Sequence, residues 1–299
     1  MKKNLIVNFT PTGMIPTKDM TPHVPVTPNE IIDQVLELSG EGLITMVHLH
    51  ARDADGRPTL EPDIYAEIIG GIRKHDKTLI ICASLSGRYE NNPEKRALPL
   101  TLDGDLKPDM GSLTLSSLNF NKEASVNAPD TVKFLAEKML QVGVKPELEA
   151  FDTGMINYAK YLDRKHLIKP PYYFNLIFGN VACMQVDPLH IGLMIRDLPL
   201  CGGTHQTSYW SIGGIGDHQF KANMCSVLFG VDEKSGVRIG LEDNIFLDDK
   251  RTTLATNRQL VERLVYISML CGRDVMSPLL ARYLLRLKQG GEFGYGIDS

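Results

Sequence analysis

Eight short apolar runs with strand character recur along this chain, and they constrain its fold more than any other feature. They cover residues 5–9, 46–50, 79–83, 112–115, 147–151, 173–178, 207–211 and 238–241. Several are separated by segments in which apolar residues recur with helical periodicity. Repeats of strand, helix and strand at this length imply parallel strands that are joined by right-handed crossovers.

Two of the predicted helices have clear signals at their ends. One covers residues 256–271 and can terminate at Gly272. The other starts after Thr27, which can act as the N-cap, with a proline in the first turn and Glu30 as the capping-box partner. The stretch from 88 to 111 predicts only a short helix inside a long loop.

The number of strands favours a closed barrel. An open, doubly wound sheet is built from the same units, but an eight-stranded (β/α)8 barrel typically takes ~250 residues, which fits this chain better. No linker is long enough to separate two domains. We therefore predict a single α/β domain over residues 1–299, a (β/α)8 TIM barrel. Its glycine-rich tail at residues 289–299 is expected to be flexible or to lie against a neighbouring subunit.

The composition is that of an ordinary globular protein, with 43% hydrophobic and 23% charged residues. A formal net charge of −4, with scattered Lys and Arg, predicts a small-molecule substrate and no nucleic-acid or membrane partner. The N-terminus lacks the apolar core of a signal peptide, which predicts a cytoplasmic protein. Buried, reduced thiols are expected at Cys82, Cys183, Cys201, Cys225 and Cys271, which show no C-x-x-C spacing.

Polar residues follow four of the predicted strands. They occupy residues 48–53, 84–88, 149–152 and 242–244. In a (β/α)8 barrel, the loops after the carboxyl ends of the strands form the active site. These four segments therefore predict an active site at one mouth of the barrel.

The His48-x-His50 spacing at the end of the second strand predicts a metal site. Side chains at i and i+2 of a strand point the same way, with Cα atoms about 6.5 Å apart, a span that two imidazoles can bridge to one cation. Glu242 can supply a third ligand, because strand eight closes beside strand one and lies across the mouth from strand two. Three protein ligands with an open position are typical of a catalytic zinc ion.

Each of these residues also has a purely structural interpretation. A lone histidine is more often a core residue with satisfied hydrogen bonds, although an H-x-H at a barrel strand end favours a ligand pair. Glu242 and Asp243 alone would fit a solvated loop or a helix N-cap. Ser86 and Gly87 would fit a turn, and Glu149 would fit a buried salt bridge.

Taken together, these segments resemble the β-keto acid cleavage enzymes, a family that includes the 3-keto-5-aminohexanoate cleavage enzyme of lysine fermentation. The resemblance spans most of the chain. Its motifs are PVTP with a following glutamate at residues 25–30, VHLHARD at 47–53, GRP at 56–58, PDM at 108–110, PELE and FD at 146–152, and VRIGLEDN at 237–244. Each motif alone is weak, but in this order they are specific. The resemblance implies a zinc-binding (β/α)8 barrel, usually a homotetramer.

The resemblance also implies a reaction and its residues. Family members convert a β-keto acid and acetyl-CoA into acetoacetate and a new acyl-CoA. By motif, His48, His50 and Glu242 would hold zinc or another divalent ion, and Arg238 and Asp243 would match the family's catalytic pair. Asp243 would act as the base and the Arg238 guanidinium would orient it. The enolate would attack the thioester, and the departing CoA thiolate would cleave the adduct in a retro-Claisen step.

Further residues resemble those that contact the substrate in the family. Ser86, the Gly87 amide and Thr114 would bind the substrate carboxylate, and Glu149 resembles an acidic residue near the base. Ser84 and Ser116 are alternatives, because the local match at strands three and four is loose.

Two departures from the family concern the substrate. Residues 12–17 lack the acidic residue that would suit an ammonium group, which predicts a keto acid with a neutral or apolar tail. Residues 84–88 lack paired glycines and instead carry Arg88, which could bind a substrate or CoA anion. No Gly-rich phosphate loop marks the CoA site.

Two other classes of protein remain as alternatives. A hydrolase of the amidohydrolase type is also a barrel with an H-x-H motif, but it would need histidines after strands five and six, where this chain has Glu149, Asp152 and Asn175. A non-enzymatic protein with a structural zinc site would need four protein ligands and no open position. No fourth Cys or His has suitable spacing.

Overall fold

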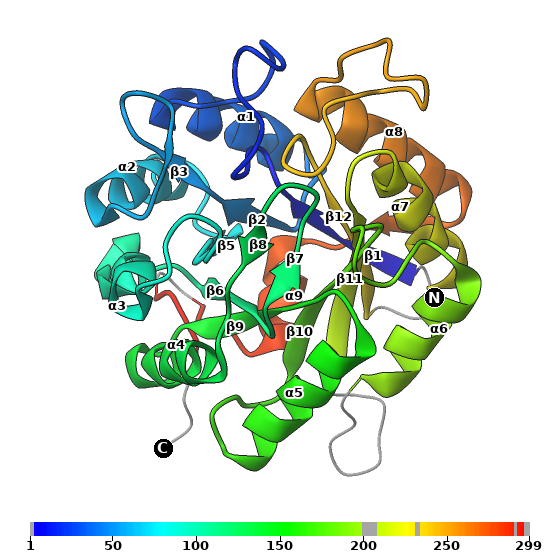
Figure 1. Cartoon of the computed structure of the whole chain (residues 1–299). Coiled ribbons are helices and arrows are strands. Elements are labelled where there is room, and N and C mark those ends of the chain that lie inside the picture. Colours follow the sequence, from blue (N-terminus) through cyan, green and yellow to red (C-terminus); the bar gives the residue numbers. More distant parts are fainter. Residues whose placement is uncertain (1–2, 199–207, 231–233, 290–291, 296–299) are drawn as a thin grey trace.

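A closed barrel of eight parallel strands forms the centre of the computed structural model, which describes residues 3–198, 208–230, 234–289 and 292–295 (Figure 1). In order around the barrel the strands are β1 (Lys3–Phe9), β2 (Met46–Leu49), β5 (Ile80–Ala83), β6 (Met110–Thr114), β9 (Lys145–Ala150), β10 (Tyr172–Phe178), β11 (Ser208–Gly214) and β12 (Ser235–Ile239). Parallel pairing of β12 with β1 closes the ring. The predicted (β/α)8 barrel is confirmed.

The ends of the strands differ from the predicted ends by up to three residues. At β12 the strand ends at Ile239, two residues before the predicted end, so Gly240 and Leu241 separate it from Glu242. The cause is Gly240, which has a φ of +154° and passes so close to Thr10 that an added Cβ would lie 2.0 Å from its carbonyl oxygen. An apolar run does not reveal where such a backbone turn interrupts the pairing.

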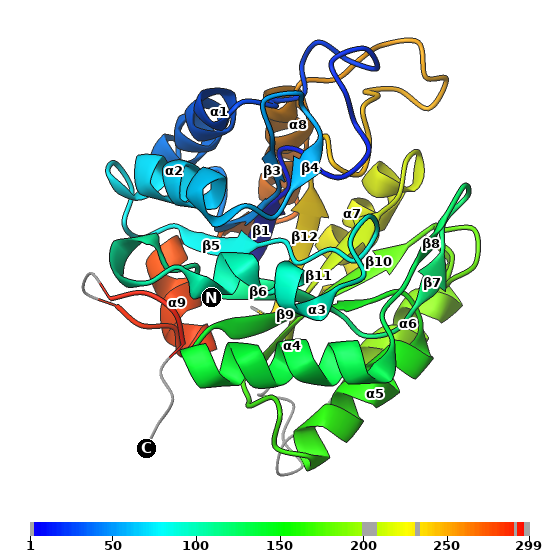
Figure 2. The same ribbon diagram turned by 60° about the vertical axis from the view of Figure 1, so that its left-hand side comes forward.

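Helices cover the outside of the barrel between successive strands (Figures 1 and 2). They are α1 (Pro28–Gly40), α2 (Pro62–Arg73), α4 (Pro129–Val142), α5 (Thr153–Arg164), α6 (Pro188–Asp197), α7 (His218–Phe229) and α8 (Asn257–Leu270). After β5, the four-residue α3 (Pro93–Arg96) and two 3-10 turns (Leu98–Thr101 and Gly104–Leu106) replace a full helix, in the loop where a short helix was predicted. The predicted capping box of Thr27 and Glu30 begins α1.

The two ends of the barrel are built differently. Two small hairpins lie at the carboxyl ends of the strands: β3 (Ala51–Arg52) with β4 (Pro58–Thr59), and β7 (Leu118–Asn119) with β8 (Ala124–Ser125). At the opposite end, β13 (Arg273–Val275) extends the sheet beside β1, and α9 (Pro278–Leu285) packs its apolar side chains against the barrel interior. Figure 2 shows α9 and the hairpin β7–β8 on opposite sides. The hairpin end is therefore the open mouth.

Of the glycine-rich tail that was predicted to be flexible, the structure describes residue 289 and residues 292–295. Phe293 and Tyr295 are buried at the closed end of the barrel by contacts within this chain. The Arg73 guanidinium lies 3.4 Å from the centre of the Phe293 ring, and the Tyr295 hydroxyl donates a 2.9 Å hydrogen bond to the carbonyl of Pro170. The two aromatic side chains between the glycines thus make packing contacts that the glycine content of the tail does not indicate.

Replacing Tyr295 with alanine is expected to lower the free energy of unfolding by about 3–5 kcal/mol, because a buried aromatic side chain is removed. Tyr295→Phe should cost about 1 kcal/mol, since it loses the hydrogen bond to Pro170 and keeps the buried ring. Chemical denaturation of both variants measures the difference. Equal stability of Tyr295→Ala and the parent protein would show that the tail is not packed in solution.

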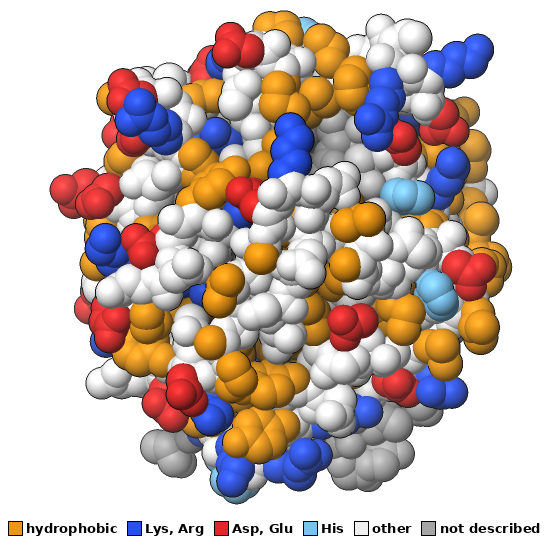
Figure 3. Space-filling view, viewed as in Figure 1, with side chains coloured by type: hydrophobic (Ala, Val, Ile, Leu, Met, Phe, Trp, Pro, Cys, Tyr) orange, Lys and Arg blue, Asp and Glu red, His pale blue; other side chains and the backbone are white. Residues whose placement is uncertain are grey.

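Three further sequence predictions concern the surface and the cysteines. No described helix has the length and apolar character needed to cross a bilayer. On the face seen in Figure 3, acidic and basic side chains are interspersed. The described cysteines are free, as expected, but only Cys82 is buried, and Cys271 is exposed at the end of α8. Cys201 lies outside the described residues.

Candidate active site

The three predicted metal ligands lie together at the mouth of the barrel. His48 belongs to β2, His50 follows it directly, and Glu242 reaches them from the loop after β12. One ligand atom from each residue lies within 4.8 Å of the others, and the two imidazole centroids are 5.2 Å apart. The two histidines are buried and Glu242 is largely so. The structure therefore brings these three side chains close enough to share one cation.

The hydrogen bonds of Glu242 show how well this group fits a cation. Its Oε1 lies 3.1 Å from Nε2 of His50 and 2.7 Å from Nη2 of Arg238. Its Oε2 is buried and has no hydrogen-bond partner among the described residues. A buried carboxylate oxygen without a partner is costly, and two imidazoles with one carboxylate are a usual donor set for a catalytic zinc ion. The residues present fit a divalent cation.

The charge states of the ligands also suit metal binding. Burial lowers the pKa of His50, against the opposing charge of Glu242, and so favours the neutral imidazole that can coordinate a metal. Burial raises the pKa of Glu242, but the charges of Arg238, His50 and His48 outweigh it and hold that pKa well below its usual range. Glu242 is therefore ionised at neutral pH.

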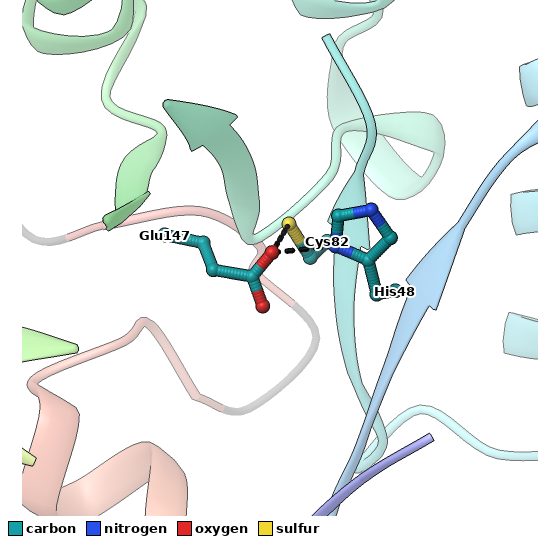
Figure 4. A group of neighbouring side chains, drawn as sticks. All are labelled: His48, Cys82 and Glu147. Atoms are coloured by element: carbon teal, nitrogen blue, oxygen red, sulfur yellow. Dashed lines mark hydrogen bonds and ion pairs between the residues drawn. The ribbon is translucent and has the colours of Figure 1, made fainter. Parts of the chain in front are cut away.

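Behind His48 lies Glu147, which β9 contributes to the barrel interior (Figure 4). Its Oε2 is 2.5 Å from Nδ1 of His48, and its Oε1 accepts a 2.8 Å hydrogen bond from the amide of Asn8. Engagement of Nδ1 leaves Nε2 of His48 for a metal. A carboxylate that fixes the tautomer and the ring orientation of a ligating histidine is a recurrent feature of metal sites.

His48, Cys82 and Glu147 also form a group that could hold a metal. Two observations argue against it. Burial and the nearby Glu147 charge raise the pKa of the Cys82 thiol well above its usual range, so it is protonated, whereas a metal needs the thiolate. The thiol instead donates to Oε2 of Glu147 at 3.2 Å, and all three residues are buried. We interpret this group as support for His48.

The contact between His48 and Glu147 also controls the protonation of His48. Burial lowers its pKa, but the charges of Glu147 and Glu242 outweigh burial and raise it to about 9. Burial raises the pKa of Glu147, and the paired His48 more than offsets it, bringing that pKa to about 2. A cation at Nε2 would replace one proton of the imidazolium while the proton on Nδ1 stays with Glu147.

A second cluster surrounds the guanidinium of Arg238, which β12 points into the mouth. Its Nε donates to Oδ2 of Asp243 at 2.9 Å, and its Nη1 lies 3.9 Å from Oε1 of Glu149. The hydroxyl of Thr114 donates to Oε2 of Glu149 at 2.6 Å. Burial raises the pKa of Asp243 to about 6, although Arg238 opposes this shift, and burial also raises the pKa of Glu149. The predicted catalytic residues are thus joined to the metal ligands through Arg238.

The residues of the loop after β5 that were predicted to bind the substrate carboxylate are separate from the two clusters. No side-chain hydrogen bond between described residues joins Ser84, Ser86 or Gly87 to the two clusters. Ser84 is buried, and Oγ of Ser86 accepts from the backbone N–H of Arg88 at 3.3 Å. A Cβ at Gly87 would lie 2.5 Å from the buried guanidinium of Arg96, so close packing accounts for this glycine.

Arg88 is engaged by the hairpin β7–β8. Its guanidinium stacks 3.6 Å from the ring centre of Phe120, and its Nε lies 3.5 Å from Oε1 of Glu123. Arg88 therefore ties the loop after β5 to this hairpin.

Sequence reasoning missed two site residues. Glu147 stands two positions before Glu149 on the same strand, so the alternation of a strand places both side chains on one face, and that signal could have identified it. Asn8 is a polar residue inside the apolar run of β1, and it donates to both Glu147 and Asn175.

Glu147→Gln is expected to weaken zinc binding about 10- to 100-fold, the usual effect of removing such a partner. Glutamine keeps the shape but loses the charge that orients His48. Titration of the metal-free protein against a chelator measures the affinity, with Glu123→Gln, at the rim of the mouth, as the control. Unchanged affinity in Glu147→Gln would argue that His48 is oriented by other contacts.

Comparison with known proteins gives a consistent result. The chain matches the family of beta-keto acid cleavage enzymes over residues 4–287. It is 31% identical over 290 residues to a 3-keto-5-aminohexanoate cleavage enzyme of Fusobacterium nucleatum, covering 97% of this chain and 100% of that protein. It is 33% identical over 287 residues to a 3-oxoadipate:acetyl-CoA acetyltransferase of Cupriavidus necator, covering 96% of each.

Among solved structures, the ternary complex of ObcA with a C4-CoA adduct and oxalate superposes with a TM-score of 0.75. Its sequence is 21% identical, and the match covers 89% of this chain and 68% of that one, which shows a shared fold. The family match covers almost the whole chain, and two relatives above 30% identity are matched along nearly their full length. The chain belongs to the β-keto acid cleavage enzyme family.

Proposed function

We propose that this protein converts a β-keto acid and acetyl-CoA into acetoacetate and a new acyl-CoA, with a zinc ion held by His48, His50 and Glu242. The observation that supports this most strongly is Oε2 of Glu242, a buried carboxylate oxygen that lacks a hydrogen-bond partner among the described residues and lies beside two imidazoles. Two relatives support the reaction class, because their names pair a keto acid with acetyl-CoA: a 3-oxoadipate:acetyl-CoA acetyltransferase and a 3-dehydrocarnitine:acetyl-CoA trimethylamine transferase.

When bound, zinc or another divalent ion would act as a Lewis acid toward the keto and carboxylate oxygens of the substrate. Asp243 would take the proton from the carbon between those two groups, and its raised pKa suits a base. The 2.9 Å bond from Arg238 would hold the Asp243 carboxylate in one orientation. The buried surroundings would exclude water from the carbanion.

Thr114 and Glu149 would act together on the substrate carboxylate. The Thr114 hydroxyl donates its proton to Glu149 and so has none to offer a substrate in this arrangement. Burial raises the pKa of Glu149, which favours its neutral form. A protonated Glu149 would donate to Thr114, and the Thr114 hydroxyl would then be free to donate to a substrate oxygen. Ser86, Ser84 and the Gly87 amide would complete this side of the pocket.

The carbon nucleophile would then attack the thioester carbonyl of acetyl-CoA and expel the CoA thiolate. The thiolate would attack the other keto carbon of the adduct, and the carbon–carbon bond next to it would break. The carbanion released by this cleavage takes back the proton that Asp243 removed and leaves as acetoacetate, which contains the acetyl group of the thioester, while CoA leaves with the acyl tail of the original acid. Atoms and charges balance without an external oxidant or reductant.

The tail of the β-keto acid is proposed to be neutral or apolar. The first loop lies against the metal site, because Gly13 packs directly on the Glu242 side chain. The next residues are the half-buried Met14 and the exposed Ile15, and neither carries a charge that could pair with an ammonium group.

We also propose that the protein assembles with copies of itself, in a homotetramer as the family resemblance implies. Large apolar side chains are exposed at the C-terminal ends of two helices, Leu228 and Phe229 on α7 and Tyr266, Met269 and Leu270 on α8. An exposed apolar surface of this kind favours association.

Acetoacetate formation from acetyl-CoA tests the proposal. The purified protein is loaded with zinc and given 3-ketohexanoate or its 5-amino analogue, and product is measured with and without the thioester. We expect acetoacetate only when acetyl-CoA is present, and a higher kcat/KM for the unsubstituted acid. Hydrolytic products formed without CoA would favour the amidohydrolase alternative, and a preference for the amine would contradict the proposed tail.

A further inference from the structure

The first loop of the chain is pressed against the side chain of Glu242. An added Cβ at Gly13 would lie 2.2 Å from Cγ of Glu242 and 3.0 Å from its Cβ and Cδ, so only glycine fits here. The contact is with the aliphatic part of the side chain, just below the carboxylate that faces His50. The backbone of Gly13 thus limits where the carboxylate of Glu242 can lie.

Arg52 holds this loop in place. Its Nη2 donates to the carbonyl oxygen of Gly13 and, at 2.7 Å, to that of Pro16. Its Nη1 donates to the carbonyl of Gly56 in the β3–β4 hairpin at 2.9 Å. Arg52 is 2% exposed, and no carboxylate pairs with it among the described residues. A buried guanidinium whose bonds all go to backbone carbonyls serves to fix the backbone.

One short segment therefore controls two metal ligands. His50 contacts the carboxylate of Glu242 directly, and Arg52, two positions later on β3, clamps the loop that packs on the other end of the same side chain. Because His50 and Arg52 share one stretch of backbone, movement of the loop would disturb both ligands together. No other described residue bonds both to this segment of the first loop and to the hairpin.

We propose that Arg52 and Gly13 are positioning residues for the metal ligand Glu242: Arg52 holds the first loop down, and the backbone of Gly13 fixes the side-chain conformation of Glu242. This inference rests on the proposed metal site. It adds two residues outside the ligand set whose loss changes the coordination of the metal and not only the stability of the fold.

Gly13→Ala and Arg52→Met test the inference directly. In Gly13→Ala the new methyl group would push Glu242 away, and in Arg52→Met the loop would lose its two carbonyl contacts and the hairpin would lose one. We expect each variant to bind zinc about 10- to 100-fold more weakly than the parent protein, as the loss of outer contacts usually does. Titration of the metal-free protein against a colorimetric chelator gives the affinity. The visible absorption spectrum of the cobalt-loaded protein reports coordination geometry, and it should change in both variants.

Matched controls separate positioning from folding. Gly40→Ala adds a methyl group at the end of α1 where nothing lies within 4 Å, and Arg57→Met removes a 75% exposed arginine from the same hairpin. Both should keep the affinity and the cobalt spectrum of the parent. Arg52→Lys keeps the charge but cannot reach three carbonyls from one ammonium group, so it should also bind zinc weakly. If Gly13→Ala does not fold, Arg52→Lys still tests the inference.

The double variant tests whether both residues act through one contact. If Arg52 works through Gly13, the loss in Gly13→Ala with Arg52→Met should be close to the larger single loss. If the fold-losses of zinc affinity in the two single variants multiply in the double variant, Arg52 does not act through Gly13. Full zinc affinity in Arg52→Lys would also contradict this connection. If the parent protein binds zinc and the variants have the same affinity and cobalt spectrum, the inference is wrong but the proposed metal site stands. A parent that binds no metal would overturn the proposed metal site and the inference with it.

Discussion

His50→Ala is expected to abolish zinc binding at stoichiometric metal and to lower kcat/KM for acetoacetate formation at least about 1,000-fold, since several kcal/mol of Lewis-acid stabilisation are lost. The imidazole of His50 is the group that meets Glu242 at 3.1 Å, and its removal leaves two ligands instead of three. Metal content after dialysis and steady-state kinetics measure both effects.

The companion variant Glu242→Gln separates the charge of this ligand from its shape. Glutamine can occupy the space beside Gly13 but leaves the two histidines and the buried Arg238 without the carboxylate that pairs with them. We expect a loss of metal similar to that in His50→Ala. His75→Ala, at an exposed histidine after α2, is the control and should leave both measurements unchanged. Full activity of metal-free His50→Ala would refute the metal mechanism.

Asp243→Asn is expected to lower kcat about 10²- to 10⁴-fold, the usual contribution of a positioned general base, while zinc stays bound. Asparagine can still accept the hydrogen bond from Nε of Arg238, so the loop after β12 should keep its shape. It cannot accept a proton from carbon. The metal ligands are untouched, which makes the effect on kcat distinct from that of His50→Ala.

Two measurements decide the role of Asp243. Exchange of the substrate's acidic hydrogen with deuterated water, followed by NMR without acetyl-CoA, isolates the proton-abstraction step and should fail in Asp243→Asn. Asp55→Asn, at a residue whose side chain is 69% exposed, should exchange as the parent does. Unimpaired exchange in Asp243→Asn would show that another residue is the base. Glu149 would then be the first candidate, because its carboxylate lies 3.9 Å from Arg238.

The candidate site was predictable where the signal is local or repeats along the chain. The ligand pair His48 and His50 follows from the alternation of side chains along one strand. The place of Glu242 followed from counting strands, because β12 and β1 must pair to close a barrel. The Arg238 and Asp243 pairing depended on motif resemblance, and the structure places Nε and Oδ2 at hydrogen-bond distance.

Other features were not predictable, because they depend on contacts between distant segments. The bond between His48 and Glu147 joins residues 99 positions apart, and it requires the register of β2, β5, β6 and β9 across the barrel. The burial of Phe293 and Tyr295 depends on these two side chains meeting the closed end of the barrel, which glycine content does not indicate.

The sequence by itself determined the eight strands, the helix caps and the side of β2 on which its histidines lie, because periodicity and capping act over a few residues. Only the tertiary structure decided how His48-x-His50 is supported: by Glu147 behind one ring, and by Arg52 and Gly13 around the carboxylate that faces the other. The physical reason is the short range of the interactions that support the site. Hydrogen bonds and steric contacts act over a few ångströms, so they are set by how the closed barrel brings remote segments together.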